Sequence, residues 1–204
     1  MHTDKAAQID AIAEQVAGLE ASPLYAYRQG NGYQPVIGEG SLDADIMFVG
    51  EAPGETEAET GRPFVGRAGQ ELDNLLASIG LAREDVYITN VVLDRPPGNR
   101  DPHVGEIELY APFLRAQIEV IQPRVIATLG RFAMDFMLDY FDITEAQGQR
   151  ISDLHGTPWA AEVDYGQVTV VPLYHPAAMF YNRSLEPEMQ ADFQEVLGEL
   201  VTAV

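Results

Sequence analysis

The chain has 204 residues and a formal net charge of −20 at pH 7, from 12 Lys or Arg and 32 Asp or Glu. It contains no cysteine, which excludes disulfides and thiolate-held metal or iron–sulfur sites. Its four histidines lack the close spacing of zinc ligands, so we expect no bound metal.

The acidic residues are spread along the whole chain, which is typical of proteins adapted to high salt, as in halophiles. The length indicates one folded domain over residues 1–204. No apolar run is long enough to span a membrane, and the first residues carry no signal-peptide pattern. We therefore expect a monomeric cytoplasmic protein without membrane contact.

Residues 3–20 place apolar side chains at helical spacing, which predicts an amphipathic N-terminal helix. Residues 21–44 are rich in proline and glycine and predict a loop with one short strand near Val36 and Ile37. An α/β core follows from about residue 36 to 204. Its strands are predicted at residues 45–50, 85–90, 124–129 and 168–173, and its helices at residues 68–80, 104–121, 131–140 and 187–202. Residues 142–166 are polar and predicted to be irregular.

Strands that alternate with helices predict a parallel sheet covered by helices on both faces. Polar residues come at the ends of three of these strands: Glu51, Asn90 and His175. Because the carboxyl ends of parallel strands meet at one edge of the sheet, we expect these side chains to converge there. The order of elements therefore predicts a ligand site at this edge.

The first strand runs into a glycine turn that contains Glu51 and Gly54. Such glycines let backbone N–H groups approach a ligand closely. Glu51 is then either an acid presented to a ligand or water, or a surface acid that caps the turn. No Gly-Lys-Ser/Thr follows, which disfavours a nucleoside triphosphate site. Phe64 closes the stretch and is either a core aromatic or a stacking platform for a flat ligand.

Asn90 ends an apolar strand and offers one acceptor and two donors. This amide matches the O4 and N3–H edge of uracil, whereas cytosine reverses the pattern; the same amide can also satisfy the turn that follows. His175 comes directly after a strand and before a proline. It is either a donor to an anion that develops at the strand end or a structural histidine.

Basic residues are scarce, yet several arginines fall in loops predicted for the same edge. They are Arg62, Arg67, Arg95, Arg100 and Arg183. A basic rim of this kind is what contact with phosphate requires, although isolated solvated arginines would give the same pattern. Met179 and Phe180, with Tyr181, belong either to the core or to a wedge that enters a duplex where a base has left the stack.

Five pieces of the sequence, in this order and spacing, resemble the uracil-DNA glycosylase superfamily, most closely its family 4. They are GEAPGETE (50–57), GRPFVGRAG (61–69), YITNVV (87–92), RPPGNRDP (95–102) and HPAAMFYN (175–182). The resemblance spans about residues 36–200 and implies a three-layer α/β/α sandwich with a central four-stranded parallel sheet. It also implies a DNA repair enzyme that flips uracil out of DNA and hydrolyses its N-glycosidic bond, so that uracil-containing DNA is the expected partner.

The resemblance assigns the glycine turn to substrate binding and catalysis. Glu51 lies in the water-activating motif, where Ala52 stands at the position of an aspartate in the superfamily's first family. Gly54 belongs to the same motif. Glu57 matches a position that crowds the C5 methyl of thymine.

The resemblance implies that three other side chains contact the uracil base. Phe64 would stack on uracil, Asn90 would read its edge, and His175 would donate to O2 as the bond breaks. The loop arginines, with Met179 and Phe180, would contact DNA.

The chain departs from family 4 at one feature, because those enzymes carry a four-cysteine iron–sulfur cluster. Two of the family's cysteine positions match Asp94 and Tyr110, and the other pair falls near Ser22 and Tyr25. The joint loss of all four predicts that no cluster is bound and that packing replaces it. It also motivates a second hypothesis, a catalytically weak paralogue that binds damaged or single-stranded DNA.

Overall fold

The structure is a computed structural model that describes residues 2–203, with the side chains of residues 4–200. Its strands form one six-stranded sheet in the order β1-β3-β2-β4-β6-β5. They are β1 (Glu39–Gly40), β2 (Ile46–Gly50), β3 (Tyr87–Asn90), β4 (Val125–Leu129), β5 (Trp159–Val163) and β6 (Gly166–Leu173). The pairs β2–β3, β2–β4 and β4–β6 are parallel, whereas β1–β3 and β5–β6 are antiparallel. The predicted α/β class is confirmed. The four inner strands, β3, β2, β4 and β6, run parallel, and the antiparallel edge strands β1 and β5, which lie outside the four predicted core strands, make the sheet mixed and six-stranded.

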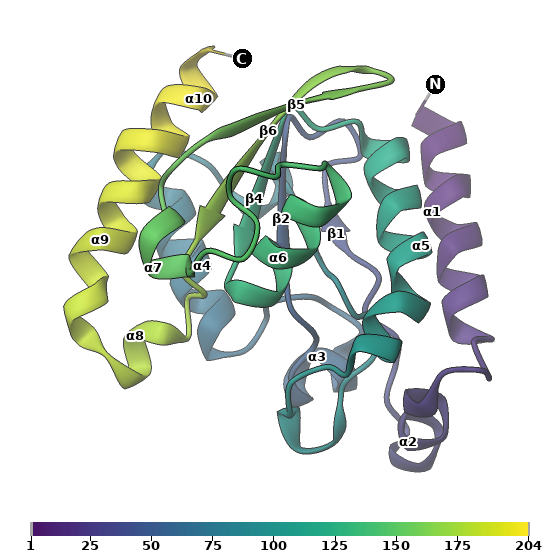
Figure 1. The fold of residues 1–204 in the computed structure, drawn as a ribbon. Coiled ribbons are helices and arrows are strands. Elements are labelled where there is room, and N and C mark those ends of the chain that lie inside the picture. Colours follow the sequence, from purple (N-terminus) through teal and green to yellow (C-terminus); the bar gives the residue numbers. More distant parts are fainter. Residues whose placement is uncertain (1, 204) are drawn as a thin grey trace.

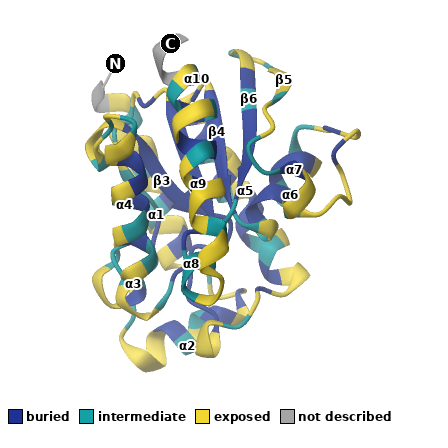
Figure 2. Ribbon diagram, turned by 90° about the vertical axis from the view of Figure 1, so that its left-hand side faces the viewer, coloured by how far each residue is buried: buried dark blue, intermediate teal, exposed yellow. Residues whose placement is uncertain are grey.

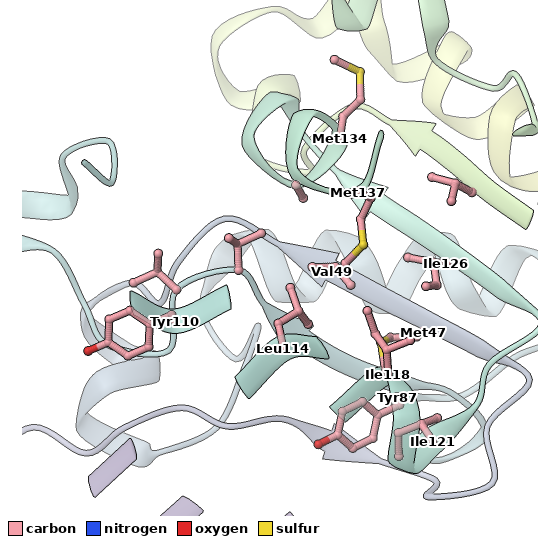
Figure 3. Packing of buried hydrophobic residues seen from close by; sticks show 14 of the residues in the cluster. Met47, Val49, Tyr87, Tyr110, Leu114, Ile118, Ile121, Ile126, Met134 and Met137 are labelled. Atoms are coloured by element: carbon pink, nitrogen blue, oxygen red, sulfur yellow. The ribbon is translucent and has the colours of Figure 1, made fainter. Parts of the chain in front are cut away.

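Side chains alternate along β2, so the strand contributes to two hydrophobic clusters. Met47 and Val49 pack in a cluster with α1 (His2–Ala17), α5 (Val104–Ile121) and α6 (Arg131–Tyr140), which is shown in Figure 3. Ile46 and Phe48 pack in the other, with α4 (Arg67–Ser78), α9 (Glu186–Ala191) and the segment Asp192–Leu197 that leads to α10 (Gly198–Ala203). Helices therefore cover both faces of the sheet (Figure 1).

The best-predicted helices have clear start and stop signals. In α5 the Glu106 carboxylate accepts the backbone N–H of His103 at 2.8 Å, which caps the first turn. The helix ends at Gln122, in the left-handed conformation, directly before Pro123. Both bounds of α5 and of α6 agree with the prediction.

The N-terminal region differs most from the prediction. The first helix ends at Ala17 rather than residue 20, and α2 (Pro23–Asn31) occupies part of the predicted loop. Ser22 caps α2, and Gly32 ends it with φ +69°. The short strand is β1 at residues 39–40 rather than at Val36 and Ile37.

Other segments predicted as irregular also contain short elements. The loop after β2 holds α3 (Glu55–Thr60), and residues 142–166 hold α7 (Ile151–Leu154) and β5. The predicted last helix is preceded by α8 (Ala178–Tyr181) and a 3-10 turn (Arg183–Leu185). Single 3-10 turns also lie at Arg83–Asp85 and Pro97–Asn99. β5 escaped prediction because it is a half-exposed edge strand, in contrast to the buried inner end of β6 (Figure 2).

None of the helices in residues 2–203 has both the length and the apolar character needed to cross a membrane.

Candidate active site

One pocket lies at the carboxyl edge of the sheet. Glu51 follows β2, Asn90 is the last residue of β3 and His175 follows β6, and all three side chains line this pocket. Its volume of about 440 Å³ is in the range of small-molecule sites. Figure 1 shows α3 and α8, the helices that follow β2 and β6, at the same end of the sheet. The convergence predicted from topology is confirmed.

Gly50 makes room for two side chains of the pocket. It is the last residue of β2 and pairs in register with Asn90 of β3. A Cβ at residue 50 would lie 2.5 Å from Asn90 Oδ1 and 2.6 Å from Phe64 Cζ, closer than van der Waals contact allows. The asparagine amide and the phenylalanine ring therefore meet over a bare backbone, and only glycine permits that approach.

Asn90 carries an unused hydrogen-bond acceptor into this space. Its side chain is only 1% exposed, and Oδ1 accepts no hydrogen bond from any described residue. A buried carbonyl oxygen without a partner is costly, so such atoms usually have a ligand or a water as partner. The oxygen is therefore free to accept a hydrogen bond from a ligand that enters the pocket.

Phe64 forms one wall of the pocket and is almost fully buried. Its ring centroid lies 5.6 Å from that of His175, with 32° between the planes. Its backbone has φ +50°, which is rare for a bulky side chain and concentrates at functional sites.

Glu57 also lines the pocket and is fixed by the backbone that follows Phe64. Its Oε1 accepts the N–H groups of Val65 at 2.9 Å and Gly66 at 2.8 Å. A Cβ on Gly54 would lie 2.6 Å from Oε2, so glycine is also needed there. The carboxylate is therefore a rigid part of the wall.

His175 presents a single donor to the pocket. Its Nδ1 accepts the backbone N–H of Ala177 at 3.1 Å, so the proton of the neutral ring resides on Nε2. Burial lowers the pKa of His175 to about 4, although the nearby Glu57 carboxylate opposes this shift. At neutral pH the ring is uncharged and can donate only through Nε2.

Glu51 sits in the turn after β2, beside Ala52 and Gly54, which also line the pocket. Burial raises the pKa of Glu51 to about 7. The negative charge of Asp101 adds to the rise, and Arg131 opposes it. A carboxyl group poised near neutrality is suited to general acid–base chemistry.

Two of the predicted basic residues form ion pairs near the site. Arg62 makes two hydrogen bonds to the Glu39 carboxylate, at 2.7 and 2.6 Å. Arg100 does the same with the buried Glu106, at 2.9 and 2.6 Å, and also lines the pocket. Their contact with DNA stays a prediction.

Arg95 is largely internal, with 8% of its side chain exposed. It donates to Asn99 Oδ1 at 2.7 Å, to the Tyr33 hydroxyl at 2.6 Å and to Glu55 Oε1 at 2.9 Å. These bonds order the loop after β3, which forms part of the pocket wall.

The segment after His175 forms the outer lip of the site. The guanidinium of Arg67 stacks on Phe180 at 4.2 Å, and Met179 packs partly into the core. Arg183 is exposed. Tyr181 is 91% exposed and lines the pocket, whereas the sequence pattern predicts Met179 and Phe180 as the residues that contact DNA. Sequence position alone did not show which of these residues projects.

These features define an α/β protein with a pocket of about 440 Å³ at the carboxyl edge of its sheet, and comparison with known proteins identifies its family. The chain belongs to the uracil DNA glycosylase superfamily, whose family model matches residues 37–201.

More particularly, the chain is similar to several type-4 uracil-DNA glycosylases. It is 43% identical over 192 residues to that of Archaeoglobus fulgidus, which covers 94% of this chain and 92% of the relative. It is 41% identical over 189 residues to that of Saccharolobus solfataricus, covering 92% and 84%. The type-4 enzyme of Thermotoga maritima is 44% identical over 180 residues, covering 87% and 86%.

The residues at the family's cysteine positions do not suit an iron–sulfur cluster, which needs thiolate ligands. The Nη1 atom of Arg28 donates to Oδ1 of Asp94 at 2.9 Å and to Oδ2 at 2.8 Å. The hydroxyl of Tyr110 donates to the same Oδ2 at 2.5 Å. Ser22 Oγ lies 2.9 Å from the same hydroxyl, and the Arg28 guanidinium lies over the ring of Tyr25 at 5.1 Å. Within residues 4–200 no cluster of three His, Asp or Glu side chains is arranged to hold a metal either.

Proposed function

We propose that this protein is a uracil-DNA glycosylase, a repair enzyme that flips uracil out of DNA and hydrolyses its N-glycosidic bond to leave an abasic site. The observation that carries the proposal is the buried, unsatisfied Oδ1 of Asn90, which meets the Phe64 ring over Gly50. An acceptor beside a flat apolar wall matches a planar base that brings its own N–H donor. The type-4 relatives support the same activity.

Recognition of uracil would divide between these two side chains. The base stacks on Phe64, its N3–H donates to Asn90 Oδ1, and its O4 accepts from Asn90 Nδ2. Cytosine presents an acceptor at N3 and a donor at C4, so it would leave the buried amide mismatched. The discrimination is large because the penalty falls on polar groups that water cannot reach.

Thymine would be rejected by a steric wall. Glu57 lines the pocket, and its two backbone hydrogen bonds prevent the carboxylate from swinging aside. A fixed carboxylate facing C5 would crowd the methyl group that distinguishes thymine from uracil.

The reaction breaks the bond between N1 of uracil and C1′ of the sugar, and the electron pair leaves with the base. The Nε2–H of His175 donates a hydrogen bond to O2, where the negative charge develops, and the ring is neutral as it does so. Water adds to C1′. Glu51 positions this water and accepts its proton, which its raised pKa permits at neutral pH.

Contact with DNA is assigned to the rim of the pocket. The residues proposed to contact phosphate groups are Arg62, Arg67, Arg95, Arg100 and Arg183. Met179 and Phe180 are proposed to contact the DNA where the flipped base has left the stack. Arg62, Arg67 and Arg183 are exposed, and the partly exposed Arg100 also lines the pocket. We place the monomeric enzyme in the cytoplasm, with its DNA, and relate the charge of −20 to a saline interior.

We infer that this enzyme works without an iron–sulfur cluster. Arg28 and Asp94 are 3% and 1% exposed, and Arg28 also donates to the carbonyls of Val16 and Ala17 at the end of α1. The network therefore ties α2 to the loop after β3 and to α5, the regions that carry the expected cysteine positions, and Arg28 adds the end of α1. An internal ion pair and its hydrogen bonds replace the metal centre as the link between them.

A labelled oligonucleotide with one uracil tests the function, at low and at molar salt. Abasic product is expected, and its formation should fall about 100- to 1000-fold in His175→Ala, which removes the oxyanion donor. Arg150→Ala is the control, since Arg150 pairs only with Asp153 at an exposed site away from the pocket. Binding of the oligonucleotide without product at any salt would instead favour a weak paralogue that recognises damaged DNA.

A further inference from the structure

The platform residue Phe64 is held in an unfavourable backbone conformation. Its φ of +50° lies in the left-handed region, where a bulky side chain persists only when its surroundings enforce it. The conformation decides where the ring lies, because it turns the chain sharply between Pro63 and Val65. Whatever enforces it also fixes the surface on which the base would stack.

Hydrogen bonds hold the peptide groups on both sides of Phe64. Ahead of the ring, Glu57 accepts the N–H groups of Val65 and Gly66. Arg83 donates at 2.9 Å to the carbonyl of Phe64, at the other end of the peptide group that carries the Val65 N–H, and its bond to the Pro63 carbonyl holds the peptide group before Phe64.

Arg83 makes two further contacts that fix its guanidinium. It donates to the carbonyl of Pro63 at 2.6 Å and to Asp73 Oδ1 of α4 at 3.0 Å. The side chain is only 19% exposed, and it does not belong to the pocket lining. Only a planar, multidentate donor can serve two successive carbonyls and a carboxylate together.

Arg83 also links the platform to the strand that reads the base. It lies in the 3-10 turn Arg83–Asp85, directly before β3, and β3 ends at Asn90. The distance between the Phe64 ring and the Asn90 amide is therefore set through one short, hydrogen-bonded segment. A base that must stack on one and pair with the other depends on that distance.

We propose that Arg83 is a positioning residue for base recognition, acting through the backbone of Phe64 and opposite Glu57. This inference rests on the proposed function, since it concerns the same pocket. Arg83 touches neither the base nor the sugar. Its loss weakens uracil binding because the Phe64 ring moves relative to Asn90.

The test is a double-mutant cycle with Arg83→Ala, Phe64→Ala and the double variant. Excision of uracil and inhibition by free uracil are measured, together with binding of abasic DNA, which contains no base. Arg83→Ala should weaken inhibition by free uracil and lower kcat/KM by about tenfold or more, because small displacements are costly in a preorganised site. Binding of abasic DNA should stay within about twofold, and Arg83→Lys should recover part of the loss.

The cycle gives the decisive outcome. If Arg83 acts through the ring, removing it costs little more once Phe64 is already alanine. Equal losses in both backgrounds, or unchanged inhibition by free uracil, would overturn the proposal. If Arg83→Ala does not fold, Arg83→Lys and Asp73→Ala carry the same cycle. Lysine replaces the guanidinium by a single ammonium, Asp73→Ala removes the carboxylate that fixes the guanidinium, and both keep the carbon chain of residue 83. A wild-type protein that makes no abasic product refutes the proposed function instead.

Discussion

Replacing Asp94 by alanine tests whether the buried network stabilises the fold in place of a metal centre. The substitution leaves the Arg28 guanidinium, 3% exposed, without its counter-charge and removes one acceptor from the Tyr110 hydroxyl. Removing one partner of a buried ion pair typically costs about 3–5 kcal/mol. Arg28 keeps two backbone carbonyls and Tyr110 keeps Ser22, so we expect the lower end, about 3 kcal/mol.

That loss is large enough to measure by thermal and urea unfolding. For a chain of this size, about 3 kcal/mol lowers the melting temperature by roughly 6–12 °C. The Arg28→Ala/Asp94→Ala double variant should be less destabilised than the sum of the single variants, because neither charge is then left alone. The exposed pair Arg150–Asp153 is the matched control, and Asp153→Ala should change stability by less than about 1 kcal/mol.

Salt separates the two kinds of ion pair. Buried charges are screened much less than exposed ones, so the effect of Asp94→Ala should persist at molar salt. A melting temperature within about 2 °C of the wild type would refute the reasoning, since it would mean the network contributes less than about 1 kcal/mol. Additive losses in the Arg28 and Asp94 cycle would equally contradict a coupled pair.

Three further predictions concern the pocket. Gly50→Ala should lower kcat/KM about 100-fold while the protein stays folded, because the new Cβ displaces Asn90 and Phe64. Excision should decline as the pH falls below about 7, because Glu51 becomes protonated. The Glu51→Gln variant should be slower and should lack this decline. A wild-type excision rate that does not change between pH 5 and 8 would contradict this role. The folded pKa of His175 is lowered to about 4, so the unfolded chain takes up this proton first; stability should therefore drop from about pH 6.5 towards 4, and less so in His175→Gln, as urea titrations would show.

The positions of the core elements could be predicted because their sequence signals are local. The helix α5 has start and stop residues that act within one turn, α6 follows Gly130, and the four inner strands are short runs rich in apolar and β-branched residues. The helix α2 was not predicted because its proline, its one glycine and its two tyrosines favour a loop. Its cap at Ser22, the proline at its first turn and Gly32 were nevertheless visible in the sequence.

The pocket was predictable in part, since topology brings Glu51, Asn90 and His175 together without any knowledge of side-chain contacts. The partners of the arginines were not predictable, because ion pairs depend on distances between segments far apart in sequence. Arg95 illustrates this: a loop position suggested an exposed residue, yet Tyr33 and Glu55 hold it inside. The contacts of Arg83 with Pro63, Phe64 and Asp73 could not be predicted for the same reason.

The network around Asp94 gives the protein a different chemical vulnerability. A cysteine-held cluster depends on iron supply and is lost when its thiolates are oxidised. Here carboxylate, guanidinium and hydroxyl groups join the same segments, and the chain has no thiol that peroxide could attack. Treatment with peroxide or an iron chelator should therefore leave the link between α1, α2 and the loop after β3 intact.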